Sequence, residues 1–313
     1  MSSIKLENLE INGYMIYQDK DSFNFGIDAV LLANFALRES SGARIARPYD
    51  SDLQVSPLNC TYEHNAEVPP NRTHERNAEV LPHRTRELYE RNAETPLQVC
   101  DFCTGSLPIP LIMYAKRKMF FGENVKFTAF EIDKDQVELC KKSILYNKEN
   151  AMNTENIDSD ITVFDEDIKN IFMNRDKYKT MYDSFDIITV NPPYTKKGSG
   201  IVNTNDKKVA ARHEIFITFD ELCKVANLLL KSKKKFYIIH HSGRITEISK
   251  ILKKNSFEIK KLQFIYPYVD KESNLVLIEA VKDANEGVKV LEPIIVYEKE
   301  GIYTKKILKI YGK

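Results

Sequence analysis

The sequence predicts an α/β protein with a largely parallel sheet and helices on both faces. Two observations support this: apolar runs of strand length alternate with helical stretches, and polar residues follow the ends of several runs. Buried parallel strands are continuous apolar runs, and strand–helix alternation is typical of a sheet covered on both sides. The chain is 42% hydrophobic with a net charge of +1, which excludes collagen-like, wholly disordered and disulfide-scaffold classes.

The first element is a helix over residues 28–37, DAVLLANFAL, whose strong helix formers follow Asp28. Three more helices are expected at 109–119, 134–150 and 214–231. Strands are expected at 97–102, 125–132, 161–164, 185–190, 236–240, 259–265 and 274–281. The last two strands follow each other closely, which predicts an antiparallel pair at one edge of the sheet. A terminal hairpin is predicted from 290–298 and 302–310, turning at Gly301.

Residues 39–96 differ from the rest of the chain and are interpreted as an insertion. They contain no Lys, and NAE recurs at Asn65, Asn77 and Asn92. Their Pro content and scarcity of apolar residues predict a low-complexity, disordered segment. Seven Arg against ten acidic residues give it a net charge of −3, which leaves +4 for the rest. The predicted organisation is therefore an N-terminal segment 1–38, an insertion 39–96 and a core 97–313.

The five cysteines, an odd number without regular spacing, predict a reducing compartment and core or loop positions rather than a metal site. They are Cys60, Cys100, Cys103, Cys140 and Cys223. An apolar run of 18 or more residues is absent from the sequence, and the N-terminus lacks an apolar signal core. We therefore expect a cytoplasmic protein with no membrane contact and no metal.

The tetrapeptide NPPY, Asn191–Tyr194, follows the apolar run 185–190 and so lies at the carboxyl end of a strand, where open α/β sheets bind ligands. Pro192 and Pro193 fix the backbone and remove two N–H donors. The side-chain oxygen of Asn191 and the carbonyl of Pro192 can each accept a hydrogen bond. Tyr194 offers a flat face to a planar base or amide.

This set suits methylation of an exocyclic amine. The nitrogen lone pair of an aromatic or amide NH2 is delocalised into its π system. Two fixed acceptors that hold both hydrogens favour pyramidalisation, which frees the lone pair for attack. The rate gain then comes mainly from orientation and electrostatics. A structural Pro-Pro turn is the alternative reading of the same residues.

Three further segments suit a nucleotide-like cofactor. A strand that ends in Asp101 is followed by a small-residue loop with Gly105 and then a helix. Glu131, in the FEID of the next strand, is placed to bind ribose hydroxyls. After the strand 161–164, either Asp165 or Asp167 could accept a hydrogen bond from an adenine amino group.

At these residues the sequence resembles the class I S-adenosylmethionine-dependent methyltransferases, and more narrowly the tRNA(Val) adenine-N(6)-methyltransferase family. The resemblance covers almost everything except the insertion. It is carried by GYMIYQDKDSFNFGIDAVLLANFA (13–36), DFCTGSLPIPLI (101–112), FEID, NPPY, ARHE (211–214), LVLIEAVKD (275–283) and GIYTKKILKIY (301–311).

The resemblance implies a Rossmann-like seven-stranded sheet whose last strand is antiparallel, and S-adenosyl-L-methionine as the cofactor. It implies N(6)-methylation of the adenosine beside the anticodon of tRNA(Val), and we expect a monomer. The implied cofactor residues are Asp101, Thr104, Gly105, Glu131, Asp167 and Asn191. The implied catalytic residues are Asn191, Pro192, Pro193 and Tyr194, and the resemblance implies that Asn191, Pro192 and Tyr194 hold the target base. One departure is Leu107, where the family usually has the second Gly of its cofactor loop.

A charge of +4 outside the insertion is small for an RNA partner, so local basic groups must make the contacts. The candidate RNA-binding residues are Lys196, Lys197, Arg212 and Arg244. Two alternatives stay open. One is a protein-glutamine methyltransferase, which uses NPPY on an amide, although that class carries an N-terminal helical domain and lacks this opening segment. The other is a catalytically weakened RNA-binding relative, supported by Leu107 and the insertion.

Overall fold

The computed structural model describes residues 4–19, 26–41, 95–122, 124–192 and 217–313. Within them the central sheet has nine strands, in the order β10-β8-β9-β7-β6-β3-β4-β5, with β11 also beside β8. The seven long strands are β3 (Leu97–Phe102), β4 (Val125–Glu131), β5 (Ile161–Asp165), β6 (Phe185–Val190), β7 (Leu230–His241), β8 (Phe257–Tyr266) and β9 (Leu275–Lys282).

Strands β5, β4, β3, β6 and β7 run parallel, and β9 is antiparallel to both of its neighbours, β7 and β8. The α/β sheet with one antiparallel strand is therefore confirmed. The predicted antiparallel pair of the last two long strands is also confirmed: β9 lies between β7 and β8, and β8 is the outermost of the seven long strands on that side. Two short strands, β10 (Lys289–Val290) and β11 (Ile294–Ile295), extend the sheet beyond the predicted seven by pairing with β8.

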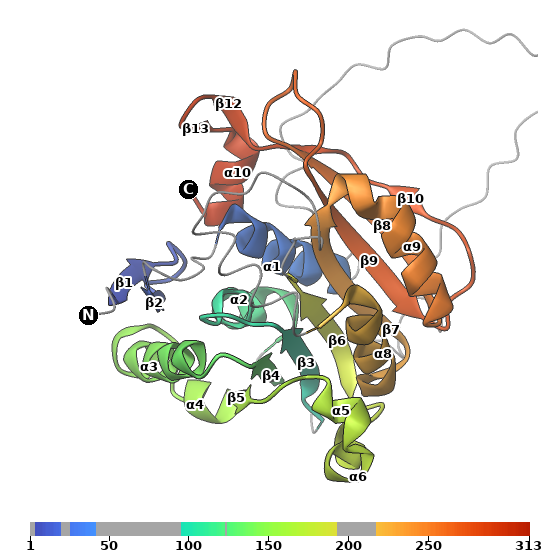
Figure 1. The fold of residues 1–313 in the computed structure, drawn as a ribbon. Helices are drawn as coiled ribbons and strands as arrows, with labels where there is room; N and C mark the ends of the chain where they lie inside the picture. Colours follow the sequence, from blue (N-terminus) through green and yellow to red (C-terminus); the bar gives the residue numbers. More distant parts are fainter. Residues whose placement is uncertain (1–3, 20–25, 42–94, 123, 193–216) are drawn as a thin grey trace, which may run out of the picture. The chain divides into compact units, whose positions relative to one another are not determined.

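Helices cover both faces of the sheet (Figure 1). On one face lie α1 (Ile27–Ser40) and α2 (Pro108–Phe120), and on the other α8 (Phe219–Leu229) and α9 (Ile245–Lys254). The helix α3 (Lys134–Asn150) lies beside β4 and β5. Three short helices follow in the chain: α4 (Ile157–Asp160), which contacts β5, and then α5 (Asn170–Met173) and α6 (Arg175–Tyr178), which contact each other.

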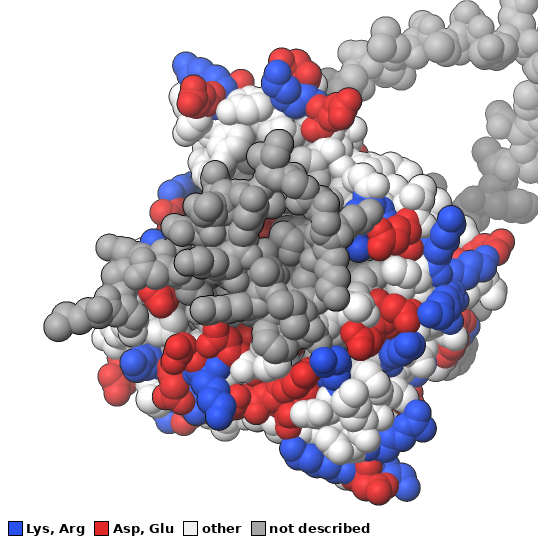
Figure 2. Space-filling model, in the orientation of Figure 1, with Lys and Arg blue, Asp and Glu red and all other residues white. Residues whose placement is uncertain are grey.

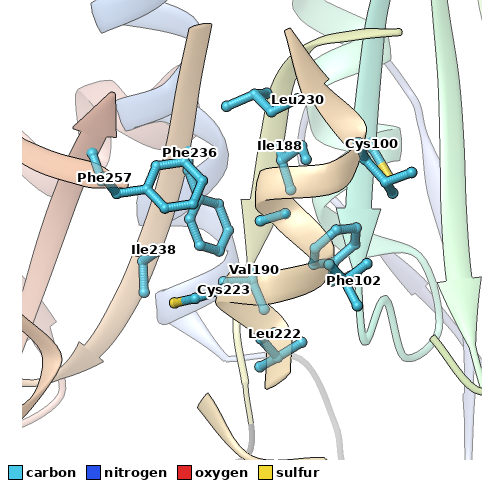
Figure 3. Packing of buried hydrophobic residues seen from close by; sticks show 14 of the residues in the cluster. Cys100, Phe102, Ile188, Val190, Leu222, Cys223, Leu230, Phe236, Ile238 and Phe257 are labelled. Carbon is cyan, nitrogen blue, oxygen red and sulfur yellow. The ribbon is translucent and has the colours of Figure 1, made fainter. Parts of the chain in front are cut away.

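The alternation of side chains along β7 explains this layering. Phe236 and Ile238 point into a buried cluster under α8 and α9, together with Phe102 and Val190 of the neighbouring strands (Figure 3). Tyr237, between them, faces α1, where its ring packs edge-on against Phe35 at 5.6 Å. Burial on both faces is why these strands are nearly continuous apolar runs.

Two predicted segments differ clearly from the structure. The helix expected over 214–231 begins at Phe219 and ends at Leu229, and β7 begins at Leu230, six residues before the predicted strand start. The segment expected to be the second strand of the terminal hairpin is instead α10 (Lys305–Tyr311), because Thr304 caps it and Ile307 and Ile310 fall on one buried helical face. Only β12 (Tyr297–Lys299) and β13 (Ile302–Tyr303) form the hairpin.

The opening segment forms an unpredicted antiparallel hairpin of β1 (Ile4–Asn8) and β2 (Met15–Asp19). It is attached to α3 by Asn147, whose amide exchanges two hydrogen bonds with the backbone of Met15 at 2.7 and 2.8 Å. Among the described helices, none has both the length and the apolar composition that crossing a membrane requires.

The chain divides into two units, one of residues Ala46–Thr95 and one of all the rest. The predicted insertion lies outside the described residues except at its ends. We expect that replacing residues 42–94 with a short Gly-Ser linker leaves the remaining unit folded, because that unit contains the complete sheet. The melting temperature should change by less than about 4 °C, as expected when stability changes by under ~1 kcal/mol. An unfolded product by circular dichroism would overturn the interpretation of residues 39–96 as a passive insertion.

Candidate active site

The carboxyl ends of β3, β4 and β6 bring most of the described candidate residues to one edge of the sheet (Figure 1). Asp101 pairs in register with Thr189 of β6 and Ala129 of β4. Glu131 ends β4, and Asn191 directly follows β6. All three residues were predicted to lie at strand ends. The strand order brings them together, because β3 lies between β4 and β6.

Asp101 is almost completely buried, at 1% exposure. The hydroxyl of Thr189 donates to its Oδ1 at 2.5 Å. Its Oδ2 and the hydroxyl of Thr104 are both buried without a hydrogen-bond partner among the described residues. Burial raises the pKa of Asp101 to about 7, although the nearby hydroxyls of Thr104 and Thr189 act in the opposite direction. An unsatisfied buried acceptor is costly, so this pair fits a site that a polar or cationic ligand completes.

The loop between β3 and α2 is a tight turn built from left-handed backbone. Cys103, Gly105 and Leu107 have φ of 54°, 56° and 81°. The N–H of Thr104 donates to the carbonyl of Phe130 at 3.1 Å, which fixes the loop against β4. A Cβ on Gly105 would meet nothing within 4 Å, so the loop needs this glycine for its φ rather than for space. Leu107, in contrast, holds its left-handed conformation with a fully buried side chain.

Glu131 holds this loop in place. Its Oε2 accepts from the N–H of Gly105 at 2.8 Å, and its Oε1 accepts from the N–H groups of Ile132 and Asp133 at 2.9 and 3.0 Å. The carboxylate is buried at 4% exposure. The structure thus gives Glu131 a structural part beside the Gly105 loop, and its predicted contact with ribose stays a prediction.

Asp165 and Asp167 lie at and just after the end of β5, which is the other neighbour of β4. Asp165 ends β5 in register with Glu131. Asp167 caps the following turn by accepting from the N–H of Lys169 at 3.0 Å, and its Oδ2 lies 3.5 Å from the Lys169 ammonium. The predicted contact of Asp167 with an adenine is not tested by this geometry.

Asn191 contacts a residue that sequence reasoning did not assign to the site. Its Nδ2 donates to Oδ2 of Asp28, in the first turn of α1, at 3.0 Å. Asp28 is 8% exposed, and its Oδ1 accepts from the N–H of Ala29 at 3.0 Å. Asn191 is half-buried and Pro192 is buried. Pro193, Tyr194, Lys196, Lys197 and Arg212 lie outside the described residues.

Arg244 lies just after the end of β7, the strand next to β6. Its guanidinium forms two hydrogen bonds with Glu247, at 2.7 and 3.1 Å, and its Nη1 lies 3.3 Å from Nε2 of His240. Burial lowers the pKa of His240 to about 3, so this ring is neutral at physiological pH. Because Glu247 already binds this guanidinium, a phosphate would have to compete with Glu247 for Arg244. The contact of Arg244 with RNA stays a prediction.

The lysines at the start of β7 give little support to a broad basic surface. Lys231 and Lys234 both pair with Asp186 at 3.0 Å, and Lys235 pairs with Glu279 at 3.2 Å. Figure 2 shows acidic and basic side chains interleaved on the described part of the face that is turned to the viewer in Figure 1. Each of these three lysines is paired with a buried carboxylate, so they add little charge for phosphate binding.

The described cysteines are unpaired: Cys100, Cys103, Cys140 and Cys223 are all free thiols. Burial raises the pKa of Cys100 and Cys103, the CxxC pair, which keeps both thiols protonated and unreactive. Within the described ranges, no cluster of three His, Cys, Asp or Glu is arranged to hold a metal ion.

No protein-family model matches the chain, and no curated protein matches it either. Among solved structures, it is similar to Atu636 from Agrobacterium tumefaciens, described as a predicted O-methyltransferase. The identity is 14% over 71% of this chain and 91% of that one, with a TM-score of 0.53. This likeness shows that the chain has a methyltransferase fold.

Two other similar structures are TrmN from Thermus thermophilus and TYW2 from P. horikoshii in complex with MeSAdo. They are 14% and 11% identical to this chain and have TM-scores of 0.40 and 0.46. The alignments cover 63% and 91% of this chain, and 47% and 73% of theirs.

Proposed function

We propose that this protein is an S-adenosylmethionine-dependent methyltransferase that modifies the exocyclic amino group of an adenosine in tRNA, next to the anticodon of tRNA(Val). The observation that carries the proposal is the position of Asn191. Its amide follows β6 at the sheet edge that also holds Asp101, and its nitrogen is bound to Asp28. Its oxygen is then the atom that can accept from a substrate amine.

The residues around Asp101 fit the cofactor. The unpartnered Oδ2 of Asp101 and hydroxyl of Thr104 can bind the ammonium and carboxylate of an amino-acid group. The left-handed Gly105 loop, held by Glu131, exposes no bulky side chain at Gly105 and allows close approach. When bound, S-adenosylmethionine supplies a methyl group on a positively charged sulfur.

The acceptors of the NPPY segment would activate the amine. The side-chain oxygen of Asn191 and the carbonyl of Pro192 take the two N–H hydrogens, so the nitrogen lone pair turns out of the base plane toward the methyl group. No strong base would be needed before attack, because the amine would become acidic as it gains the methyl group and would then release one N–H proton to water, while the sulfur would leave as a neutral thioether. His240, buried next to Arg244 at the end of β7, is an uncharged ring and adds no positive charge to this edge.

A substrate-class comparison tests the proposal. The protein is incubated with methyl-tritiated cofactor and, in parallel, with unmodified tRNA(Val), a DNA oligonucleotide of the same anticodon-arm sequence, and a glutamine-containing peptide. We expect label in the tRNA alone. Label in the peptide would replace the proposal with protein-glutamine methylation. Cofactor binding without transfer to any substrate would favour a weakened RNA-binding relative.

Leu107 gives a separate prediction about the cofactor. Leu107→Gly removes a fully buried side chain, which costs more than the ~1 kcal/mol gained by relieving left-handed strain. The melting temperature should fall, while cofactor affinity should rise if the side chain occupies space that the cofactor needs. Calorimetry measures the affinity, and Leu107→Ala, which keeps a Cβ, is the matched control. Unchanged or weaker affinity in Leu107→Gly would contradict intrusion.

A further inference from the structure

The contact between Asp28 and Asn191 joins residues that are 163 positions apart in the sequence. Asp28 lies in the first turn of α1, and Asn191 lies just past β6. Both oxygens of the Asp28 carboxylate accept a hydrogen bond: Oδ1 from the N–H of Ala29 and Oδ2 from Nδ2 of Asn191, each at 3.0 Å. This use of both oxygens is what makes an aspartate, rather than an asparagine, suited to the position.

An asparagine amide can point either way with almost the same shape, and only its partners decide which end faces the substrate. A carboxylate only accepts hydrogen bonds, so Asp28 selects the orientation in which the nitrogen of Asn191 faces α1. The oxygen then faces away from Asp28. In the opposite orientation an NH2 group would face the NH2 of the substrate, and donor would meet donor.

We propose that Asp28 is a positioning residue for methyl transfer, which fixes the amide of Asn191 so that its oxygen accepts from the substrate amine. This inference rests on the proposed function. Asp28 does not itself need to touch the substrate or the cofactor. Its effect should therefore appear in the rate of the chemical step rather than in the binding of either partner.

The backbone before α1 is shaped around this carboxylate. Gly26 precedes the helix, and a Cβ on it would lie 2.8 Å from Oδ1 of Asp28. A glycine at this position therefore leaves the room that the carboxylate occupies. The helix N-terminus adds a favourable environment for a negative charge.

The test compares Asp28→Asn with the unchanged full chain. An asparagine at 28 has one acceptor for two donors, so it either loses the bond to Ala29 or lets the amide of Asn191 turn. We expect kcat to fall roughly 10- to 100-fold, as for a misplacement of about 1 Å, with KM for tRNA and cofactor affinity largely kept. Asp220→Asn is the matched control. Asp220 likewise lies in the first turn of a helix, α8, but it pairs with Lys224 and Lys254 instead of Asn191.

A double-mutant cycle separates positioning from a general structural role. In an Asn191→Ala background the amide is gone, so adding Asp28→Asn should not lower kcat further. Equal multiplicative losses in both backgrounds, or a parallel loss of kcat, cofactor affinity and melting temperature, would overturn the inference. So would a wild-type kcat in Asp28→Asn. If the unchanged protein itself transfers no methyl group to tRNA, the proposed function fails instead, which distinguishes the two failures.

Discussion

Asn191→Ala is expected to lower kcat for methyl transfer by roughly 100- to 1000-fold, the usual loss when one fixed hydrogen-bond partner of the transition state is removed. The alanine side chain cannot accept a hydrogen from the amine, so the lone pair stays delocalised. It also leaves Asp28 without its partner at 3.0 Å. Cofactor affinity should remain close to that of the unchanged protein, because Asp101 and the Gly105 loop are intact.

Steady-state kinetics with labelled cofactor, together with calorimetry of cofactor binding, measure both quantities. The control is Asn227→Ala, which removes an amide that donates to the carbonyl of Asn255 at 3.0 Å, on α8 and away from the NPPY segment. It should leave kcat unchanged. Full activity in Asn191→Ala would remove the base-holding role from Asn191.

Asp101→Asn is expected to have opposite effects on cofactor binding and on stability. The variant no longer offers the cofactor the charged Oδ2, which has no hydrogen-bond partner among the described residues. The Kd for the cofactor should therefore rise roughly 10- to 100-fold, as for the loss of a hydrogen bond to a charged group. The protein without cofactor should become more stable at pH 8, because a buried charge is removed. The hydroxyl of Thr189 can still donate to the side-chain oxygen of an asparagine at position 101, as it does to the aspartate.

The pH dependence follows from the raised pKa of Asp101, which burial shifts from 3.8 to about 7. Between these values the folded protein keeps a proton that the unfolded chain has lost, so stability falls as the pH rises through this window. Asp101→Asn has no carboxyl to ionise at this position and so avoids this loss of stability. Its melting temperature, relative to that of the unchanged protein, should be only slightly higher at pH 4, rise further up to pH 7 and be roughly 4 °C or more higher at pH 8.

Asp186→Asn is the control with the opposite sign. Burial acts to raise the pKa of Asp186. The pKa nevertheless stays below its ordinary value, because the carboxylate binds Lys234, the backbone of Gln98 and Lys231. Its ionised form therefore stabilises the fold at neutral pH, and Asp186→Asn should lower the melting temperature at pH 8. A melting temperature that falls in Asp101→Asn as well would contradict the account of an uncompensated buried carboxylate.

Much of the fold could be predicted because burial on both sheet faces makes each strand a distinct apolar run. The ranges of β3, β6 and α3 match their sequence predictions. The strand β7 could not be delimited in this way, since its first residues, Leu230–Lys235, carry a lysine-rich pattern that resembles a solvated helix end. Pairing with β6 and β9 overrides that local pattern.

Some residues of the candidate site could likewise be predicted from the sequence, and others could not. Asp101, Glu131 and Asn191 could be found because they lie at or just after the ends of predicted strands. Asp28 could not, because its role depends on a contact across 163 residues, and Thr189 is hidden inside a strand where a buried polar residue has no local signature. His240 could not be assigned to this edge either, because only the pairing of β7 with β6 brings the end of β7 beside the end of β6.

The most direct test of the central claim is mass spectrometry of nucleosides from unmodified tRNA(Val) treated with the protein and a cofactor whose methyl group carries deuterium. The account predicts N6-methyladenosine that carries the deuterated methyl group, at the adenosine beside the anticodon, and almost none with the Asn191→Ala protein. A deuterated methyl group on a ring nitrogen or a ribose oxygen would contradict amine methylation by the NPPY segment, as would equal transfer by both proteins.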